Sequence, residues 1–394
     1  MNIHYLELGS LGMDRGAHLL VKRALRNLPQ GAQLQVVGSC RNLPLHLRTW
    51  CRAQGHAFDS AAGVITRGSA DIGRWKNAEK AGIASSAEGS VEQSPPLTWG
   101  LAARGSTVEA GTPAFDFSLI NKDEVWADEA ARLYKMALSA QWDPETAIDW
   151  SAPIDHPPEI EDAVVQVMTY LIENETAALL VPARFLGRIH PHFREIMQLL
   201  AIQTADEARH IEVFNRRALL NRNELGLSTV GGQASLKTLL DEPDFALATF
   251  LLSVLGEGSF LSLLWFLRDH APDPVTRQVA KLTAQDEARH VAFGLAHLQR
   301  HGEKQPNFIE NLKMVIERRH DTLAHTSGLN EEVFDALVLL AAGSWDPAAI
   351  VKGWTAVEEL KVEMHEGRIR RLVKLGFPAP EATELSALHT RNFM

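Results

Sequence analysis

The pentapeptide Asp-Glu-Ala-Arg-His occurs twice in this chain, at Asp206–His210 and at Asp286–His290. Both copies lie inside long segments whose apolar residues recur with a helical period. Residues three apart share one face of a helix, so each copy can offer a carboxylate and an imidazole to a single point. A chance duplication of this length has a probability of order a few per cent. The repeat therefore predicts a helical bundle built from two similar helix pairs.

Each motif helix is expected to pair with a preceding helix that carries one more carboxylate. Glu257 is the only charged residue in the apolar segment 245–267. Before the first motif there are two candidates, Glu173 and Glu175, and Glu175 is the one that shares its face with apolar side chains. A carboxylate on a buried face needs a counter-charge, and a metal ion can supply it.

These positions together predict a dinuclear metal site inside the bundle. Hard carboxylates combined with imidazole suit iron or manganese, whereas a structural zinc site would use thiolates. We expect two iron ions, with a manganese–iron pair or manganese as alternatives, and O2 as co-substrate. A buried ion-pair network of Glu, Arg and His is the competing interpretation. The predicted ligands, which are also the predicted catalytic residues, are Glu175, Glu207, His210, Glu257, Glu287 and His290.

Four residues beside the ligands are predicted to support them. Asp206 and Asp286 can accept the outer N–H of a ligating imidazole, and Arg209 and Arg289 can pair with those aspartates. The alternative is that all four are solvated helix charges. The glycines on either side of Glu257 indicate a π-bulge or room for substrate, or else close helix packing.

Composition narrows the class of protein. The chain has 394 residues, with 39 basic and 49 acidic, and a formal charge of −10, which argues against nucleic acid or an anionic membrane as the main partner. Cys40 and Cys51 form no CxxC motif, which argues against a rubredoxin centre or a disulfide scaffold. The N-terminus has no signal-peptide pattern, so we expect a cytoplasmic protein. The segment 245–267 is long enough to span a bilayer, but its central Glu257 favours a buried helix.

The pattern along the chain predicts three regions. Residues 1–70 alternate strand and helix signals and predict a small α/β domain of two layers. Residues 71–121 lose periodicity and are expected to form a linker or a wrapping segment. Residues 122–394 are predicted to be helical, with a four-helix bundle followed by extra C-terminal helices. His190 and His192 flank a proline at a predicted helix start, where we expect them to face solvent.

The helical region resembles the ferritin-like non-haem di-iron superfamily, on the strength of the six ligands and the doubled Asp-Glu-x-Arg-His motif. It looks most like the oxygen-activating branch, which includes multicomponent monooxygenase hydroxylases and acyl-carrier-protein desaturases. The sequence departs from several subfamilies. Phe214 stands where a radical-storing reductase subunit has tyrosine, Thr283 where arylamine oxygenases have a third histidine, and Leu261 where methane and toluene hydroxylases have threonine.

The first 70 residues resemble the TusA/SirA-like sulfur-carrier fold through the segment Leu11–Val37. That family has its active cysteine in a CPxP motif after a Leu-Gly pair, and the matching positions here begin at Arg15 and Gly16. The persulfide nucleophile is therefore missing. We expect a docking or structural role for this domain, with Cys51 packed as a small apolar side chain.

The leading hypothesis is an O2-dependent di-iron oxidase or monooxygenase that oxidises a small organic substrate, free or carrier-bound. The resemblance implies an external electron donor or reductase, because the chain has no electron-transfer domain of its own. An iron-handling or peroxide-detoxifying ferritin relative is one alternative, and a non-enzymatic interaction protein is another. We expect no nucleic-acid or membrane partner. The apolar helix faces after residue 306 either cover the bundle or form a homodimer seam.

Overall fold

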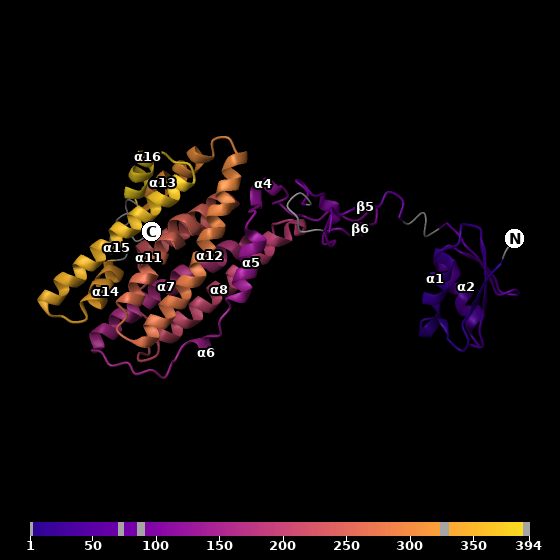
Figure 1. Cartoon of the computed structure of the whole chain (residues 1–394), viewed down its shortest axis with the longest axis horizontal. Helices are drawn as coiled ribbons and strands as arrows, with labels where there is room; N and C mark the ends of the chain where they lie inside the picture. Colours follow the sequence, from indigo (N-terminus) through magenta and orange to yellow (C-terminus); the bar gives the residue numbers. More distant parts are fainter. Residues whose placement is uncertain (1–2, 70–74, 85–90, 324–330, 389–394) are drawn as a thin grey trace. The chain divides into compact units, whose positions relative to one another are not determined.

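The structure is a computed structural model that describes residues 3–69, 75–84, 91–323 and 331–388. The chain forms two compact units. Unit 1 comprises Met1–Ala84 and Ala102–Ala114, and unit 2 comprises Ser85–Leu101 and Phe115–Met394. The predicted connecting segment, 71–121, is therefore shared between the two units. Figure 1 shows the elements of each unit.

The described residues of unit 1 contain a four-stranded sheet, two α-helices and the 3-10 helix η1 (Met13–Arg15). The strand order is β1-β2-β4-β3, with β1 parallel to β2 and the other neighbours antiparallel. A separate two-stranded antiparallel ribbon joins β5 to β6. The elements are β1 (His4–Glu7), α1 (Ala17–Arg26), β2 (Gln33–Val37), α2 (Leu43–Ala53), β3 (Ala57–Asp59), β4 (Val64–Thr66), β5 (Glu79–Lys80) and β6 (Thr107–Val108).

The core of unit 1 lies between the helices and the four-stranded sheet. Leu34 and Val36 alternate onto one face of β2 and pack with Val21 of α1 and Leu47 of α2. Cys51 is fully buried in α2, and burial raises the pKa of its thiol to about 12, so this cysteine packs as an apolar side chain. The predicted small α/β unit is present, while the resemblance to the sulfur-carrier family stays a prediction.

Unit 2 is helical and confirms the predicted fold class. Long helices form the bundle, and shorter ones lead into it and cover it. In chain order the helices are η3 (Leu97–Trp99), α4 (Lys122–Val125), α5 (Ala130–Ser139), α6 (Pro144–Ala147), α7 (Pro158–Leu186), η4 (Pro191–Phe193), α8 (Arg194–Ala218), α9 (Val230–Asp241), α10 (Phe245–Thr249), η5 (Phe250–Glu257), α11 (Gly258–Asp269), α12 (Pro274–Lys304), α13 (Phe308–Leu323), α14 (Glu331–Ala342), α15 (Pro347–Lys374) and α16 (Ala379–Ala387).

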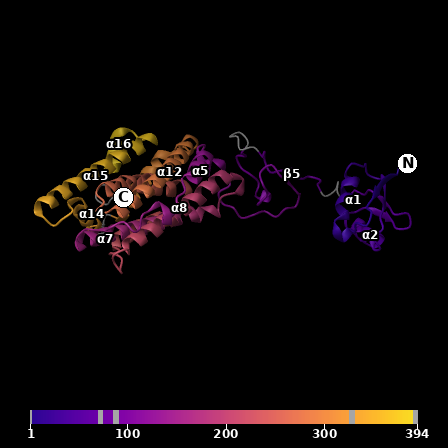
Figure 2. The ribbon, with the colours of Figure 1, turned by 60° about the horizontal axis from the view of Figure 1, so that its bottom comes forward.

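Two helix pairs make the four-helix bundle. The first pair is α7 with α8, and the second is the continuous run α10–η5–α11 with α12. Helix α12 also packs against α8, which joins the pairs, and Figures 1 and 2 show these helices side by side from two directions. Helix α12 begins with Pro274 at its first turn, and the side chain of Asp273 caps it by accepting from the backbone N–H of Thr276.

The C-terminal helices cover this bundle. Helix α14 packs against α7, α15 packs against α11, and α13 packs against α9 and α12. The apolar residues Val333, Leu337 and Leu360 are buried in these contacts. Of the two roles open to the apolar faces after residue 306, covering the bundle is the one that this structure displays. A homodimer seam stays a prediction.

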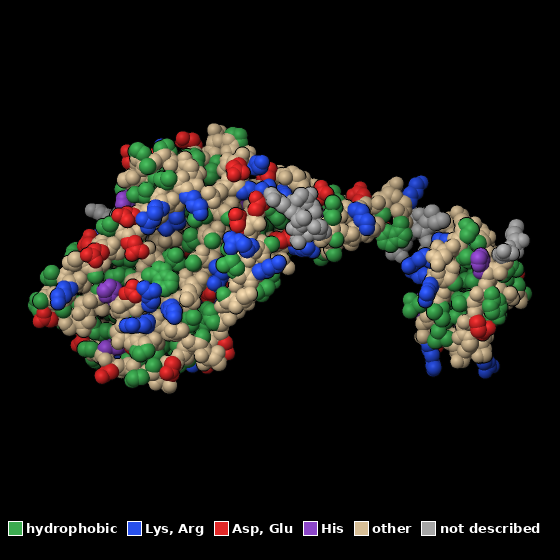
Figure 3. Space-filling view, viewed as in Figure 1, with side chains coloured by type: hydrophobic (Ala, Val, Ile, Leu, Met, Phe, Trp, Pro, Cys, Tyr) green, Lys and Arg blue, Asp and Glu red, His purple; other side chains and the backbone are tan. Residues whose placement is uncertain are grey.

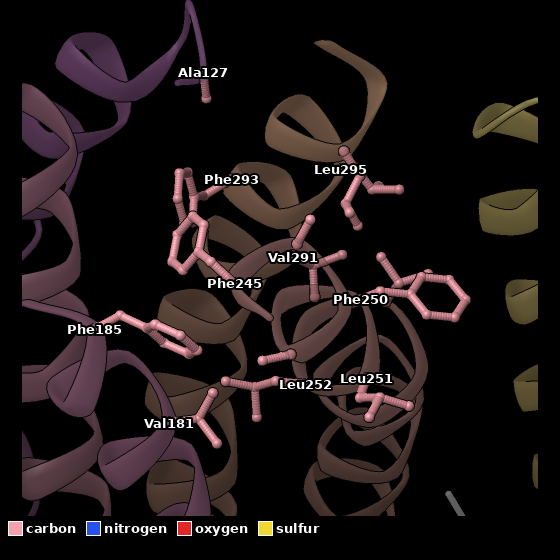
Figure 4. Packing of buried hydrophobic residues seen from close by; sticks show 14 of the residues in the cluster. Ala127, Val181, Phe185, Phe245, Phe250, Leu251, Leu252, Val291, Phe293 and Leu295 are labelled. Carbon is pink, nitrogen blue, oxygen red and sulfur yellow. The ribbon is translucent and has the colours of Figure 1, made fainter. Parts of the chain in front are cut away.

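The apolar segment predicted as a buried helix is indeed interior. Among the described residues, Phe245–Asp269 is the one helix that is long and apolar enough to cross a membrane, and 78% of its most apolar window is buried inside the protein. Figure 4 shows Phe245, Phe250 and Leu252 from this run packing with residues of α7 and α12. The run is therefore a core helix of the bundle, while the cytoplasmic location stays a prediction.

The expectation that His190 and His192 face solvent is wrong. Both are buried, with exposed fractions of 1% and 4%. Nε2 of His192 accepts a hydrogen bond of 3.0 Å from the backbone N–H of Glu92, and the ring of Trp99 packs on His192 at 5.4 Å. The irregular segment before α4 therefore covers the start of α8, which helical periodicity around residue 190 could not reveal.

Candidate metal centre

The four core helices bring all six predicted ligands to one place. Glu175 comes from α7, and Glu207 and His210 from α8. Glu257 ends the π-helix η5, and Glu287 and His290 come from α12. None of the six is more than 5% exposed. The spacing of three residues inside each motif puts its glutamate and histidine on the inward face, as the sequence predicts.

The donor atoms form two overlapping groups. One group contains Glu175 and His210, the other contains Glu257 and His290, and Glu207 and Glu287 belong to both. Within each group the donor atoms lie within 4.8 Å of one another. The two shared carboxylates can therefore bridge two ions, while one glutamate and one histidine complete each side. This is the donor set of a dinuclear carboxylate centre.

Several donor atoms in the centre have no hydrogen bond within the described part of the chain. They are Oε1 of Glu207, Oε2 of Glu257, both carboxylate oxygens of Glu287 and Nδ1 of His290. His290 Nδ1 lies 3.0 Å from Glu207 Oε1, and His210 Nδ1 lies 3.2 Å from Glu207 Oε2. Two imidazoles face four buried carboxylates in this way, and buried acidic groups in excess of their cationic partners are costly, so donor atoms crowded toward a common point fit ligands of cations. The residues present thus fit two iron or manganese ions.

Burial and mutual repulsion shift the pKa values of the carboxyl groups in the centre. Burial raises the pKa of Glu175 well above its ordinary value, and the neighbouring Glu207 and Glu287 raise it further. Burial and Glu287 likewise raise the pKa of Glu257. Burial would lower the pKa of His210, but the adjacent carboxylates outweigh it and hold that pKa well above the usual range. The protonated forms of Glu175, Glu257 and His210 are therefore favoured, and these protons reduce the repulsion between the carboxylates.

The aspartates of the two motifs are crossed: the aspartate of each motif lies beside the histidine of the other motif. Nε2 of His210 lies 3.2 Å from Asp286, which belongs to the other motif, and Nε2 of His290 lies 3.4 Å from Asp206. Each imidazole therefore turns Nδ1 toward the centre and Nε2 toward an aspartate. Hydrogen bonds from His210 and Arg209 hold the pKa of Asp286 low against the effect of burial. The aspartates consequently stay anionic and fix the orientation of the opposite ring.

Arginines and two residues of the preceding segment complete this network. Arg209 donates to Asp206 at 2.6 Å and to Asp286 at 2.8 Å, so it bridges the crossed pairs. Arg289 donates to Asp286 as well. Nε1 of Trp142 donates to Asp286 at 2.8 Å, and Gln141 exchanges hydrogen bonds with Asp206 and Arg209. Trp142 and Gln141 were not predicted, because they precede α6 and carry no helical register with the motifs.

Gln203 is a further residue that the sequence analysis missed. It lies four residues before Glu207 on the buried face of α8, and its Nε2 donates to Glu257 Oε1 at 3.1 Å. Its spacing of one helical turn from a predicted ligand is a signal that could have identified it. Gln203 therefore fixes the position of one carboxylate oxygen of Glu257.

The glycines around Glu257 fulfil two of the roles considered. Residues 250–257 form a π-helix, and Arg371 of α15 donates from Nε to the backbone carbonyl of Val254 at 2.8 Å. A Cβ atom on Gly258 would lie 2.4 Å from that Nε, so glycine is needed for close packing there. A π-bulge and close packing therefore occur together at this position.

A small cavity of about 30 Å³ adjoins the centre. Glu175, Glu257 and Glu287 form part of its wall. Most of the remaining wall is apolar, and the polar exceptions are Asn174 and Arg319. The other lining residues are Ala178, Leu239, Leu251, Leu252, Gly256 and Phe260. A space of this size has room for water-sized molecules beside the carboxylates.

The chain matches no family model and no curated protein in sequence. It is similar to solved structures of R2-like ligand-binding oxidases. One, a mutant with an aerobically reconstituted Mn/Fe cofactor, has 18% identity and a TM-score of 0.46 over 61% of this chain and 93% of that chain. A second, with an anaerobically reconstituted Mn/Fe cofactor, has 17% identity and a TM-score of 0.48 over 63% and 94%. A third, with an aerobically reconstituted Fe/Fe cofactor, has 17% identity and a TM-score of 0.47 over 63% and 94%.

Proposed function

We propose that this protein is a non-haem oxidase or monooxygenase with a dinuclear iron, or manganese–iron, centre that uses O2 to oxidise a small organic substrate. The observation that carries the proposal is the convergence of four carboxylates and two imidazoles from four helices on one buried point. The four carboxylates outnumber the two imidazoles that face them, and this excess of acidic donors supports a pair of cations over a closed ion-pair network.

In this proposal, the glutamates and histidines, the aspartates and the cavity wall have different roles. Glu207 and Glu287 would be shared by the two ions, and Glu175 with His210 and Glu257 with His290 would complete the two sides. When bound, a pair of redox-active ions supplies the electrons for the reduction of O2. Asp206 and Asp286 hold the imidazoles in place, and the apolar wall of the cavity keeps bulk water away from the substrate.

An external electron donor or reductase follows from this proposal. Among the described residues, the two overlapping groups are the only clusters of His, Cys, Asp or Glu spaced to hold a metal ion. Turnover with O2 needs electrons that such a centre cannot renew by itself, so a partner or a soluble reductant has to deliver them. The other source of these electrons is a substrate that loses two electrons when it is oxidised.

Metal loading and O2 uptake test the proposal together. Metal-free protein is titrated with Fe(II) without O2, the bound metal is counted, and O2 is then admitted while O2 consumption and the visible spectrum are followed. We expect saturation near two ions per chain, because the chain offers two overlapping sites, and rapid O2 consumption that depends on bound iron. The variant Glu207→Gln, which removes a bridging carboxylate, is expected to lower metal affinity about 10-fold or more at both sites.

Glu212→Gln is the matched control, since Glu212 is an exposed residue of the same helix. It should leave stoichiometry and O2 consumption unchanged. Accumulation of iron far beyond two ions per chain would favour the iron-handling alternative instead. Absence of tight binding by either iron or manganese would leave a metal-free interaction protein and contradict the proposal.

A further inference from the structure

Unit 1 has a charge pattern opposite to that of the whole chain. Residues 15–58 contain seven basic and no acidic residues, although the chain has a formal charge of −10. This stretch includes both α-helices of unit 1, α1 and α2, and neither helix contains an acidic side chain. The solvent-facing sides of these two helices therefore carry positive charge that no acid of the same helix neutralises.

The two helices lie on the same face of the sheet and run in the same direction. β1 is parallel to β2, and β3 is also parallel to β2 because both are antiparallel to β4. Helix α1 joins β1 to β2 and α2 joins β2 to β3, so each helix runs back against the strands. Val21 of α1 and Leu47 of α2 belong to the same core. The N-terminal ends of both helices consequently lie at the same end of the sheet.

Both helices present the same series of side chains to solvent. The third residue is leucine, the sixth is basic and the tenth is arginine in each: Leu19, Lys22 and Arg26 on α1, and Leu45, Arg48 and Arg52 on α2. Residues at these spacings share one face of a helix, and all six are exposed. The two leucines are 63% and 61% exposed. These six residues are called the basic face below.

The cations of the basic face are available to a partner. Nη2 of Arg48 donates to Oγ of Ser60 at 2.7 Å, and this acceptor is neutral. Within the described part of the chain, Lys22, Arg26 and Arg52 form no ion pair. Their charges are thus free to attract an anionic surface, while the exposed leucines offer apolar contact. Protein–protein interfaces combine these two kinds of contact.

The leucines distinguish a protein partner from other polyanions. Contacts to the backbone of a nucleic acid come from cationic and polar side chains, and exposed leucines add nothing to them. A helix that lies in a membrane surface needs its continuous apolar side in the lipid, whereas the apolar sides of α1 and α2 are buried in the core of unit 1. The basic face therefore fits an acidic protein surface with apolar side chains among its carboxylates.

We propose that the basic face docks an acidic electron-carrier protein, whose reduced cofactor is oxidised as it reduces the dinuclear centre. An external donor is one of the two electron sources that the proposed function allows, and among the described residues the only metal-binding clusters are those of the centre. Docking on unit 1 attaches the donor to the chain that carries the centre, which raises its effective concentration for electron transfer. The role of the partner rests on the proposed function, whereas the docking itself does not.

Calorimetric titration of the full chain tests the docking. The probes are an acidic plant-type [2Fe–2S] ferredoxin and an acidic flavodoxin, with cytochrome c as a small basic electron carrier for comparison. A 20-nucleotide DNA strand and vesicles that contain phosphatidylserine represent the other polyanions. We expect both acidic carriers to bind and cytochrome c not to bind. Affinity for the acidic carriers should fall about 3-fold or more between 50 and 200 mM salt, because ions screen exposed charges.

Reversal of the four charges of the basic face locates the docking site. Glutamate in place of the four cations should weaken carrier binding about 10-fold or more, because each attraction becomes a repulsion. These substitutions are Lys22→Glu, Arg26→Glu, Arg48→Glu and Arg52→Glu. The matched control makes the same change of net charge at four exposed lysines of unit 2 and should leave affinity within about 3-fold. These lysines are Lys281, Lys304, Lys352 and Lys374.

The apolar part of the basic face has its own variant. Leu19→Ser combined with Leu45→Ser should weaken carrier binding about 5-fold or more while its salt dependence stays unchanged, because apolar contact is lost and the charges remain. Both side chains are exposed, and melting curves of every variant confirm that it is folded.

Reduction of the centre tests the role of the partner. Protein with oxidised iron is mixed without O2 with reduced ferredoxin or with dithionite, and the loss of iron absorbance is followed. At low ferredoxin concentration, the variant with four reversed charges should be reduced about 10-fold more slowly by ferredoxin than the unaltered chain. Dithionite should reduce both at the same rate, because a small reductant needs no docking surface.

Three results would overturn the inference. Failure of both acidic carriers to bind would remove the partner. Equal weakening by the basic-face variant and its control would place the carrier elsewhere on the chain. Tighter binding of DNA or vesicles than of either carrier, lost on charge reversal, would assign the face to those polyanions. A chain that binds two iron ions and consumes O2 but docks no carrier keeps the proposed function. A chain that docks carriers through the basic face but binds no iron rejects the proposed function and leaves the docking intact.

Discussion

Arg217 is fully buried where α8 ends, and it holds two carboxylates from neighbouring helices. It donates twice to Glu161 of α7, at 2.8 Å each, and once to Asp273 before α12, at 2.7 Å. His156 also contacts Glu161 at 2.7 Å. Burial alone would raise the pKa of both carboxyls, but the bonds from Arg217 outweigh burial and hold both values below the ordinary range.

We therefore expect Arg217→Met to reverse the way in which Glu161 and Asp273 make the free energy of unfolding depend on pH. In the unaltered chain the lowered carboxyl pKa values stabilise the fold above pH about 4 and cease to do so as the pH falls through them. In the variant the same carboxyls are buried without their cation, and their pKa values rise. The loss of unfolding free energy should be about 3–5 kcal/mol at pH 7 and clearly smaller at pH 5. Urea unfolding of both proteins at the two pH values measures it.

Arg222→Met is the control for this comparison. Arg222 pairs with Asp162, whose side chain is 66% exposed, so its removal should cost less than about 1 kcal/mol at either pH. A loss for Arg217→Met that is equal at pH 5 and pH 7, or larger at pH 5, would show that the buried carboxyls do not titrate as described.

Elements rather than single residues explain how Glu257 reaches the centre. The core run changes from α10 to the π-helix η5 and back to α11, and Glu257 is the last residue of the π-helix. Nε of Arg371 on α15 donates a hydrogen bond to the backbone carbonyl of Val254 in that turn. Burial lowers the pKa of Arg371 to about 9, and its guanidinium lies directly over Gly258. Helix α15 thus supports the local geometry of a predicted ligand.

The two glycines beside Glu257 should respond differently to alanine. Gly258→Ala places a Cβ atom against the buried guanidinium of Arg371, so we expect a loss of about 1–3 kcal/mol in unfolding free energy. Gly256→Ala meets a single atom at 3.4 Å and gains helix propensity, so its effect should stay within about 1 kcal/mol of zero. Urea unfolding of the two variants side by side distinguishes them, and equal effects would contradict the packing role of Arg371.

The sequence predicts the parts of the centre that lie along one helix. The spacing of Glu207 and His210 defines a face, and the apolar neighbours of Glu175 select it over Glu173, which is half-buried in the structure. The crossing of Asp206 to His290 was not predictable in this way. It depends on which helices become neighbours, and the period of one helix carries no information about that.

At the scale of the whole molecule, the chain passes between its two units three times. The segment Ser85–Leu101 belongs to unit 2, although unit 1 continues after it. Its contacts explain why: Trp99 packs on His192, and the backbone N–H of Lys122 donates to Gln93 at 2.8 Å. In unit 1, Lys22, Arg23 and Arg26 are exposed along α1. Figure 3 shows Lys and Arg side chains at the surface of both units.

Two truncations separate the contribution of this segment from that of unit 1. A chain that begins at Val91 keeps Trp99 and Gln93, and we expect it to melt as unit 2 does in the full chain and to bind two metal ions. A chain that begins at Phe115 loses the buried Trp99, and its unfolding free energy should fall by at least about 3 kcal/mol. Calorimetry compares the transitions. Identical melting of the two truncated chains would show that the segment does not stabilise unit 2.

The crossed aspartates make the two halves of the bundle interdependent. Each helix pair contributes its own glutamates and histidine. The aspartate that orients its imidazole comes from the other pair. A half-assembled chain would therefore present ligands whose rings are free to turn, and it would compete poorly for metal. We therefore expect tight metal binding only in molecules in which both helix pairs have packed together in register.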